Sequence, residues 1–117
     1  MQPTQALTTD TLKQLAVVDN SMAELLDELE KTDFSDEASD MLVSKLQDVI
    51  RARQILIGRL VADPQFVDRN YLQAQANMTS EFEQRAKKVL AKREALLRGI
   101  RNSKRQINVY KSIDSNR

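Results

Sequence analysis

The sequence predicts an all-α fold, an antiparallel three- or four-helix bundle with coiled-coil-like packing and a long C-terminal helix. Apolar residues recur in alternating steps of three and four, which places them on one face of a helix. The 117 residues include only two Gly and two Pro, too few for the many tight turns of a β-rich fold. The length is that of one domain, so we expect residues 1–117 to form a single helical unit.

The first predicted helix covers about residues 10–31. Residues 1–9 are polar, and we expect them to form a loose arm. Thr9 or Asp10 is a suitable N-cap, because either side chain can accept from the unpaired N–H groups of a first helical turn. The apolar stripe of this helix consists of Leu12, Leu15, Val18, Met22, Leu25, Leu26 and Leu29.

The second predicted helix covers about residues 36–62. Ser35 is a good N-cap, and Asp36 and Glu37 place negative charge where the helix dipole favours it. Pro64 ends the helix, because proline disfavours helical geometry at the preceding residue. Asp63 as N-cap with Pro64 at the first helical position is also a possible start for the next helix. The stripe consists of Leu42, Leu46, Val49 or Ile50, Arg53, Leu56 or Ile57, and Leu60.

The third predicted helix covers about residues 66–112, with residues 114–117 frayed. A break at 77–80 is one interpretation, since Ser80 and Glu83 have capping-box spacing; a continuous helix with Ser80 exposed is the favoured one. The third helix exceeds the second by about 18 residues, or about 27 Å. Its stripe consists of Phe82, Ala86, Val89, Arg93, Leu96, Ile100, Ser103, Ile107 and Tyr110.

Two arginines occupy core-type positions, Arg53 and Arg93. An unpaired buried charge is costly, so neither is expected to be buried without a partner. We expect their stems to cover the helix interface while their guanidinium groups reach nearby carboxylates. The alternative is that they face a partner protein.

The composition argues against catalysis, and we expect a protein that is not an enzyme. There is no Cys, His or Trp. His is the commonest general base and metal ligand, and a di-metal carboxylate bundle would use Glu-x-x-His motifs. Carboxylates such as Asp27, Glu28 and Glu30 fall on a face expected to be solvated. We therefore expect no cofactor and no metal site.

Charge is distributed unevenly along the chain. Residues 1–50 carry 11 acidic and 3 basic residues, whereas residues 85–111 carry 10 basic residues and one acidic residue. The favoured interpretation is that the basic helix packs against the acidic first helix, within a chain or across a dimer. The basic stretch 85–111 could instead bind nucleic acid or an acidic membrane surface. It has no aromatic residue before Tyr110 to stack on bases, and few large apolar anchors.

The overhanging end of the third helix is the candidate partner-binding surface. An apolar stripe without an intrachain partner usually marks an interaction site, and an amphipathic helix is the partner that it would accept. The alternatives are dimerisation and folding back at a break. The candidate residues are the apolar Leu96, Ile100, Ile107, Tyr110 and Ile113, flanked by Arg101, Lys104 and Arg105.

Two heptad blocks with a central arginine carry a family resemblance. Leu46-x-x-Val49-Ile50-x-x-Arg53-x-x-Leu56-Ile57-x-x-Leu60 and Val89-Leu90-x-x-Arg93-x-x-Leu96-Leu97-x-x-Ile100, with the basic end leading to Asn108-Val109-Tyr110, resemble FliT-type flagellar export chaperones. The resemblance spans most of the chain. It implies a chaperone that protects the filament-capping protein of the bacterial flagellum before export. It also implies a regulatory C-terminal segment, here about residues 101–113, although this segment is expected to continue the preceding helix.

The chain is expected to be cytoplasmic. No apolar run approaches the roughly 20 residues of a membrane span, and residues 1–11 lack the pattern of a secretory signal. The expected partner is a flagellar cap protein or a component of the export apparatus, with a homodimer as a further possibility. A structural coiled-coil adaptor, which would dimerise tightly and expose no further apolar face, is an alternative function.

Overall fold

The regular secondary structure of the described part of the molecule is all helical. The computed structural model describes the backbone of residues 3–34 and 38–115 and the side chains of residues 8–34 and 39–108. Within these ranges the chain forms α1 (Pro3–Glu30), α2 (Ala38–Ala62) and α3 (Arg69–Ser115), with no strand. The helices pack as a bundle, and the fold class predicted from the sequence is therefore confirmed as all-α.

The first helix begins earlier than the sequence indicated. α1 starts at Pro3, so residues 3–9, expected as a loose arm, are helical. Proline is favoured at the first helical position, because its fixed φ suits the helix and its missing N–H would be unpaired there. The Thr8 hydroxyl donates to Asp63 at 2.6 Å, which connects this turn to the link after α2. This hydrogen bond and one from the N–H of Gln65 lower the pKa of the Asp63 carboxyl.

The link between α2 and α3 is a turn and not the start of a helix at Pro64. The Asp63 carboxylate accepts from the N–H of Gln65 at 2.9 Å, and the Asp63 carbonyl accepts from the N–H of Phe66 at 3.1 Å. Asp68 is the N-cap of α3, because its carboxylate accepts from the N–H of Tyr71 at 3.0 Å. The predicted caps Ser35, Asp36 and Glu37 of α2 lie outside the described residues.

The third helix is continuous through residues 77–80. α3 passes this segment without interruption, with Ser80 exposed. The Thr79 hydroxyl donates to the Gln75 carbonyl one turn earlier, which is a contact compatible with helical geometry. The helix also includes residues 114 and 115, which were expected to fray, whereas residues 116 and 117 lie outside the described part.

The core consists of two apolar clusters separated by a polar layer. The larger cluster joins all three helices and includes Met22, Leu26, Leu29, Phe34, Val43, Leu46, Ala86 and Val89. The smaller cluster, at the other end of the bundle, has Leu15, Leu56 and Leu60 at its centre. Phe66 and Tyr71 pack beside it with ring centroids 5.8 Å apart in an edge-to-face arrangement. Most of these residues belong to the stripes identified in the sequence.

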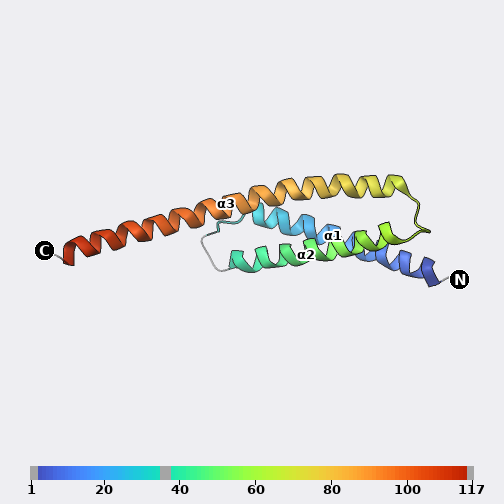
Figure 1. Ribbon diagram of the computed structural model, residues 1–117, viewed down its shortest axis with the longest axis horizontal. Helices are drawn as coiled ribbons and strands as arrows, with labels where there is room; N and C mark the ends of the chain where they lie inside the picture. Colours follow the sequence, from blue (N-terminus) through green and yellow to red (C-terminus); the bar gives the residue numbers. More distant parts are fainter. Residues whose placement is uncertain (1–2, 35–37, 116–117) are drawn as a thin grey trace.

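The molecule is elongated because α3 is much longer than its neighbours. Its principal extents are 83 × 22 × 22 Å and its radius of gyration is 21.3 Å, against about 13 Å for a compact chain of this length. Figure 1 shows α1 and α2 side by side, with α3 lying along them for its first part and then extending beyond both. We call residues 98–115, about 27 Å of helix, the α3 projection.

Candidate functional site

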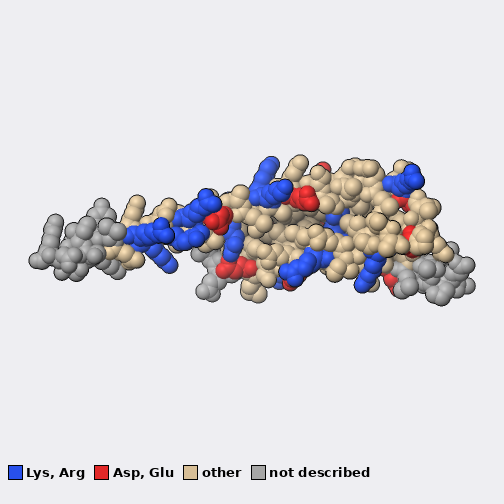
Figure 2. Space-filling view, viewed as in Figure 1, with Lys and Arg blue, Asp and Glu red and all other residues tan. Residues whose placement is uncertain are grey.

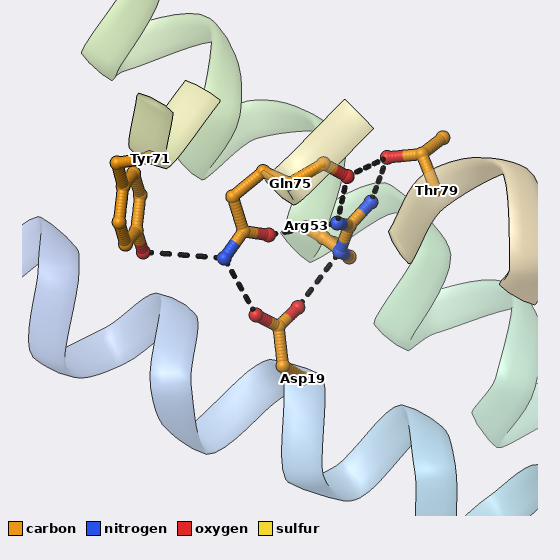
Figure 3. A network of polar contacts seen from close by, with 5 residues as sticks. All are labelled: Asp19, Arg53, Tyr71, Gln75 and Thr79. Carbon is orange, nitrogen blue, oxygen red and sulfur yellow. Dashed lines mark hydrogen bonds and ion pairs between the residues drawn. The ribbon is translucent and has the colours of Figure 1, made fainter. Parts of the chain in front are cut away.

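A buried polar network joins the three helices (Figure 3). It lies between the two apolar clusters. Its centre is Arg53 of α2, which is 5% exposed. The Arg53 Nε donates to Asp19 of α1 at 2.8 Å, and its Nη2 donates to the carbonyl and side-chain oxygens of Gln75 of α3 at 3.0 and 2.8 Å. The Nη1 donates to the Thr79 hydroxyl. One arginine thus connects all three helices.

The remaining polar atoms of the network are also hydrogen-bonded. Gln75 donates through Nε2 to the second oxygen of Asp19 at 3.1 Å and to the Tyr71 hydroxyl at 3.3 Å. Among the described residues, no buried side-chain nitrogen or oxygen lacks a hydrogen-bond partner. Arg53 also lies over the Phe82 ring, 5.4 Å from its centroid. A fully paired network of this kind fixes the register of the helices, since any sliding would leave a buried charge unpaired.

The network changes the acidity of Tyr71. Burial, and after it the negative charge of Asp19, raise the pKa of the Tyr71 hydroxyl above its ordinary value of 10.0. Both effects disfavour a phenolate, one by removing water and the other by like-charge repulsion. Tyr71 is therefore a neutral hydrogen-bonding member of the network at physiological pH.

The sequence reasoning identified Arg53 but missed Asp19 and Gln75. The expectation that Arg53 reaches a carboxylate is correct, although its guanidinium is buried and does not extend to solvent. Asp19 lies four residues after Leu15 and three before Met22, and Gln75 lies seven residues before Phe82. Both therefore occupy core positions of the same heptad stripes. A search for polar residues on the stripes, as well as arginines, would have found them.

Exposed ion pairs attach α3 to the other two helices. Arg93 donates to Asp40 at 2.8 Å, as expected of an arginine at the edge of the interface. Arg85 pairs with both Glu30 and Asp27, so these carboxylates, expected to be only solvated, face α3. The hydrogen bond from Arg85 to Glu30, and a weaker effect of Asp27, raise the pKa of the guanidinium. The two Arg85 pairs lie between the acidic first helix and the basic third helix, where the sequence predicted attraction, whereas the Arg93 pair joins α3 to α2.

The predicted partner-binding residues all lie at the end of α3. Leu96 packs against the larger core cluster, so it belongs to the bundle and not to a free surface. Ile100 and Ile107 are 39% and 53% exposed, and residues 98–108 are all exposed. Tyr110 and Ile113 lie within α3, but their side chains are outside the described part. We call Ile100 and Ile107 the described part of the α3 stripe.

The basic residues of the α3 projection do not all border the stripe. Figure 2 shows Lys and Arg side chains gathered over this part of α3. At 100° per residue, Lys104 lies about 40° from Ile100, whereas Arg105 lies about 140° from it, on the far side of the helix. Arg101 lies between these two extremes, about 100° from Ile100 around the helix. Its guanidinium contacts the Glu94 carboxylate at 3.3 Å. Of the three predicted flanking residues, Lys104 and Arg101 are therefore placed to contact a molecule on the stripe.

Two further properties concern ligands and membranes. The described residues contain no group of three or more side chains that could hold a metal ion. None of the helices, over the part of the chain that the structure describes, has an apolar stretch long enough to cross a bilayer.

Comparisons with known proteins found no match. No protein-family model, curated protein or solved structure matches the chain.

Proposed function

We propose that the protein is a non-enzymatic chaperone or adaptor that binds an amphipathic helix of its partner along the α3 stripe. The observation that supports this proposal is the extension of α3 beyond α1 and α2 with Ile100 and Ile107 exposed. Removing such side chains from water contributes roughly 25 cal/mol for each Å² of apolar surface. A partner helix laid along the projection would gain this energy without displacing any part of the bundle.

We further propose that the partner is the filament-capping protein of a flagellum and that the chaperone acts in the cytoplasm before export. The resemblance to FliT-type chaperones supports this assignment, together with an elongated helical shape that offers a free helical end. Covering the amphipathic helix of an unassembled subunit would prevent premature assembly. The proposed mechanism is binding alone, with Lys104 and Arg101 biasing the register and association rate of the partner through their charge.

We infer that the bundle is an antiparallel three-helix bundle. The order of the interhelical contacts supports this inference. Asp19 contacts Gln75 and Asp27 contacts Arg85, so residue numbers rise together in α1 and α3. Between α2 and α3 the order is reversed: Asp40 contacts Arg93, whereas the later Arg53 contacts the earlier Gln75 and Thr79.

The proposal is tested by placing charge on the stripe. In the variant Ile100→Asp/Ile107→Asp, two carboxylates would have to be desolvated against the partner helix. Because 1.4 kcal/mol is a factor of ten in affinity, we expect binding of purified cap protein to weaken by about tenfold or more. Isothermal titration calorimetry measures the effect, and far-ultraviolet circular dichroism checks that both variants remain folded.

The matched control is Asn102→Asp/Arg105→Gln, which lowers the net charge by the same two units at positions about 160° and 140° from Ile100. It should bind within about threefold of the original chain, a difference below 1 kcal/mol. Equal loss of binding in both variants would indicate a general charge effect. Absence of any binding by the original chain would refute the assignment of the cap protein.

A nucleic-acid-binding function is the second candidate, because Arg98, Arg101, Lys104 and Arg105 are all exposed on one length of helix. Phosphate contacts would make binding of duplex DNA or RNA fall steeply with salt, with a slope of about −0.9 per contact in a double-logarithmic plot for B-DNA. Fluorescence anisotropy with labelled oligonucleotides measures this slope. Under this function, reversing Arg105 on the far side of α3 would weaken binding as much as reversing Lys104.

A further inference from the structure

The face of the bundle formed by α1 and α2 alone carries an open groove. No described side chain of α3 lines it. Val17 lies two residues from Asp19, about 160° around α1, and Asp19 contacts α3. The groove is therefore on the side of the hairpin away from α3. We call it the α1–α2 groove, and its lining residues include Lys13, Val17, Glu24, Glu28, Asp48 and Ile55.

The two halves of the groove differ in chemistry. The half nearer the start of α1 has an apolar surface, with Val17 and Ile55 65% and 58% exposed, and Lys13 and Arg59 also line it. The half near the end of α1 carries Glu24, Glu28 and Asp48, with one nearby Lys45. None of these three carboxylates forms an ion pair with another described residue. The groove is thus suited to an amphipathic helix with cations beside the acidic half.

The α3 projection has the complementary charge and length. Lys104 and Arg101 border its stripe near the base, and Ile107 follows them toward the C-terminal end. The projection is about 27 Å long, and the α1 side of the groove, from Lys13 to Glu28, is about 22 Å long. A straight helix that points away from its own bundle cannot fold onto its own groove (Figure 1).

The stripe also faces the correct direction for a second bundle. It continues the row of Phe82, Val89 and Leu96, which packs against the core formed with α1 and α2. Ile100 and Ile107 therefore face the side on which the α1–α2 hairpin lies, beyond the end of that hairpin.

We propose that two copies of the chain form a reciprocal dimer, in which the α3 projection of each copy lies in the α1–α2 groove of the other. A two-fold axis near the base of the projections places the two bundles end to end. Each projection then runs from the end of the partner's α1 toward its start. In this order Arg101 and Lys104 approach Glu24 and Glu28 of the other copy, and Ile107 approaches the apolar half of its groove.

The charge pattern favours a second copy as the occupant. Each chain carries both the basic helix and the acidic groove, so one two-fold operation satisfies both at once, as an isologous interface requires. The interface makes each hairpin a four-helix unit, with its own α3 on one face and the projection of the other copy on the opposite face. In this dimer the groove of each copy covers the α3 stripe of the other, with Ile107 against the apolar half.

Dimerisation would control access to the surface that binds the client. This consequence rests on the function proposed above. The stripe that binds a partner helix is the surface that the groove covers. The dimer is therefore the closed form, and only a dissociated chain offers Ile100 and Ile107 to a client. A client must bind the projection more favourably than the groove does in order to open the dimer.

The dimer is tested by exchanging charges between the two surfaces. One variant, Glu24→Lys/Glu28→Lys, makes the groove basic; the other, Arg101→Glu/Lys104→Glu, makes the projection acidic. Each alone places like charges at both interfaces, and we expect its dimer dissociation constant to rise at least about tenfold. An equimolar mixture restores opposite charges at both interfaces, so a mixed dimer should form. Native mass spectrometry would find it at twice the 13.4 kDa of one chain.

The control variant is Arg105→Glu, which changes the same charge on the far side of α3 and should leave the dimer constant unchanged. Sedimentation velocity supplies the dimer constants, and circular dichroism verifies the fold. A monomeric original chain at about 100 μM, reversed variants that still dimerise, or a mixture that stays monomeric would each refute the reciprocal dimer.

Failure of the dimer and failure of the proposed function give different results. The groove variant Glu24→Lys/Glu28→Lys keeps an intact projection. If the dimer covers the stripe, this variant should bind cap protein at least severalfold more tightly than the original chain. If the original chain is a dimer and neither chain binds the cap protein, the proposed client is wrong and the dimer stands. If both bind it equally and both are monomeric, the dimer is wrong and the client stands.

Discussion

At the scale of single residues, the most constrained side chain is Arg53. It is buried, it contacts residues of all three helices, and each nitrogen of its guanidinium has a partner. A buried ion pair contributes little net stability compared with apolar residues of equal size, but removal of one partner leaves an uncompensated charge. The network therefore matters more for the register of the helices than for the total stability.

Replacement of Asp19 tests this role. We expect Asp19→Ala to lower the free energy of unfolding by about 3–5 kcal/mol, because Arg53 would remain charged in a dry environment. Asp27→Ala is the matched control on the same helix. Its carboxylate is exposed and its partner Arg85 retains Glu30, so the loss should be below about 1 kcal/mol. Urea denaturation followed by circular dichroism measures both, and equal losses would contradict the proposed importance of the buried pair.

The raised pKa of Tyr71 predicts a pH dependence in alkali. The unfolded chain releases the Tyr71 proton near the ordinary pKa of 10.0, whereas the folded chain retains it to higher pH. Above pH 10 the folded state therefore binds more protons, and the contribution of Tyr71 to stability falls as pH rises through its folded pKa.

Ultraviolet titration of tyrosinate in Tyr110→Phe reports Tyr71 alone, since the chain has two tyrosines. We expect a midpoint above 10 in buffer and a return toward 10 in concentrated urea. Identical midpoints in the two solvents would show that burial and Asp19 do not act on this hydroxyl.

At the scale of helices, the two parts of α3 differ in what holds them. The first part supplies Gln75, Ala86 and Val89 to the core and network, whereas the side chains of residues 98–108 are all exposed. Isolated helices are marginal in water, so the projection depends on the preceding turns for its helical nucleus. The end of α3 is thus available for a partner at no cost to the bundle.

Truncation after Leu97 tests this division of α3. At a concentration low enough to keep the chain monomeric, removal of residues 98–117 should change the free energy of unfolding by no more than about 0.5 kcal/mol, as for surface changes in general. Partner binding should be lost. Leu26→Ala, at a position that is 0% exposed, should cost about 2–5 kcal/mol in the same denaturation experiment. A comparable loss on truncation would mean that the projection packs against the bundle.

At the scale of the whole molecule, the separation of charge is the most informative property. The net charge of +1 conceals an acidic half and a basic end. Part of this polarity is satisfied within the chain by Arg85 and Arg93, which pair with carboxylates of α1 and α2. The remainder, the basic α3 projection and the acidic half of the α1–α2 groove, lies on separate surfaces. This remainder is the basis of the proposed reciprocal dimer.

The sequence by itself determined the helical class, the stripes of Leu15, Leu26 and Leu46, and the polarity of charge. These properties are local, because the helical period places residues three and four apart on one face whatever the rest of the chain does. Local signals were weaker at the helix ends. Thr9 and Asp10 look like caps, yet α1 starts at Pro3; Pro64 looks like a helix start, yet Asp68 is the cap.

The tertiary structure decided which residues meet. Asp19, Arg53 and Gln75 are far apart in the sequence, and only the relative positions of three helices bring them together. The same holds for the open α1–α2 groove, which depends on the face that α3 covers, and for the length of α3 that projects. Contacts and exposed surfaces depend on how the helices are arranged in space, and the period of each helix alone does not specify that arrangement.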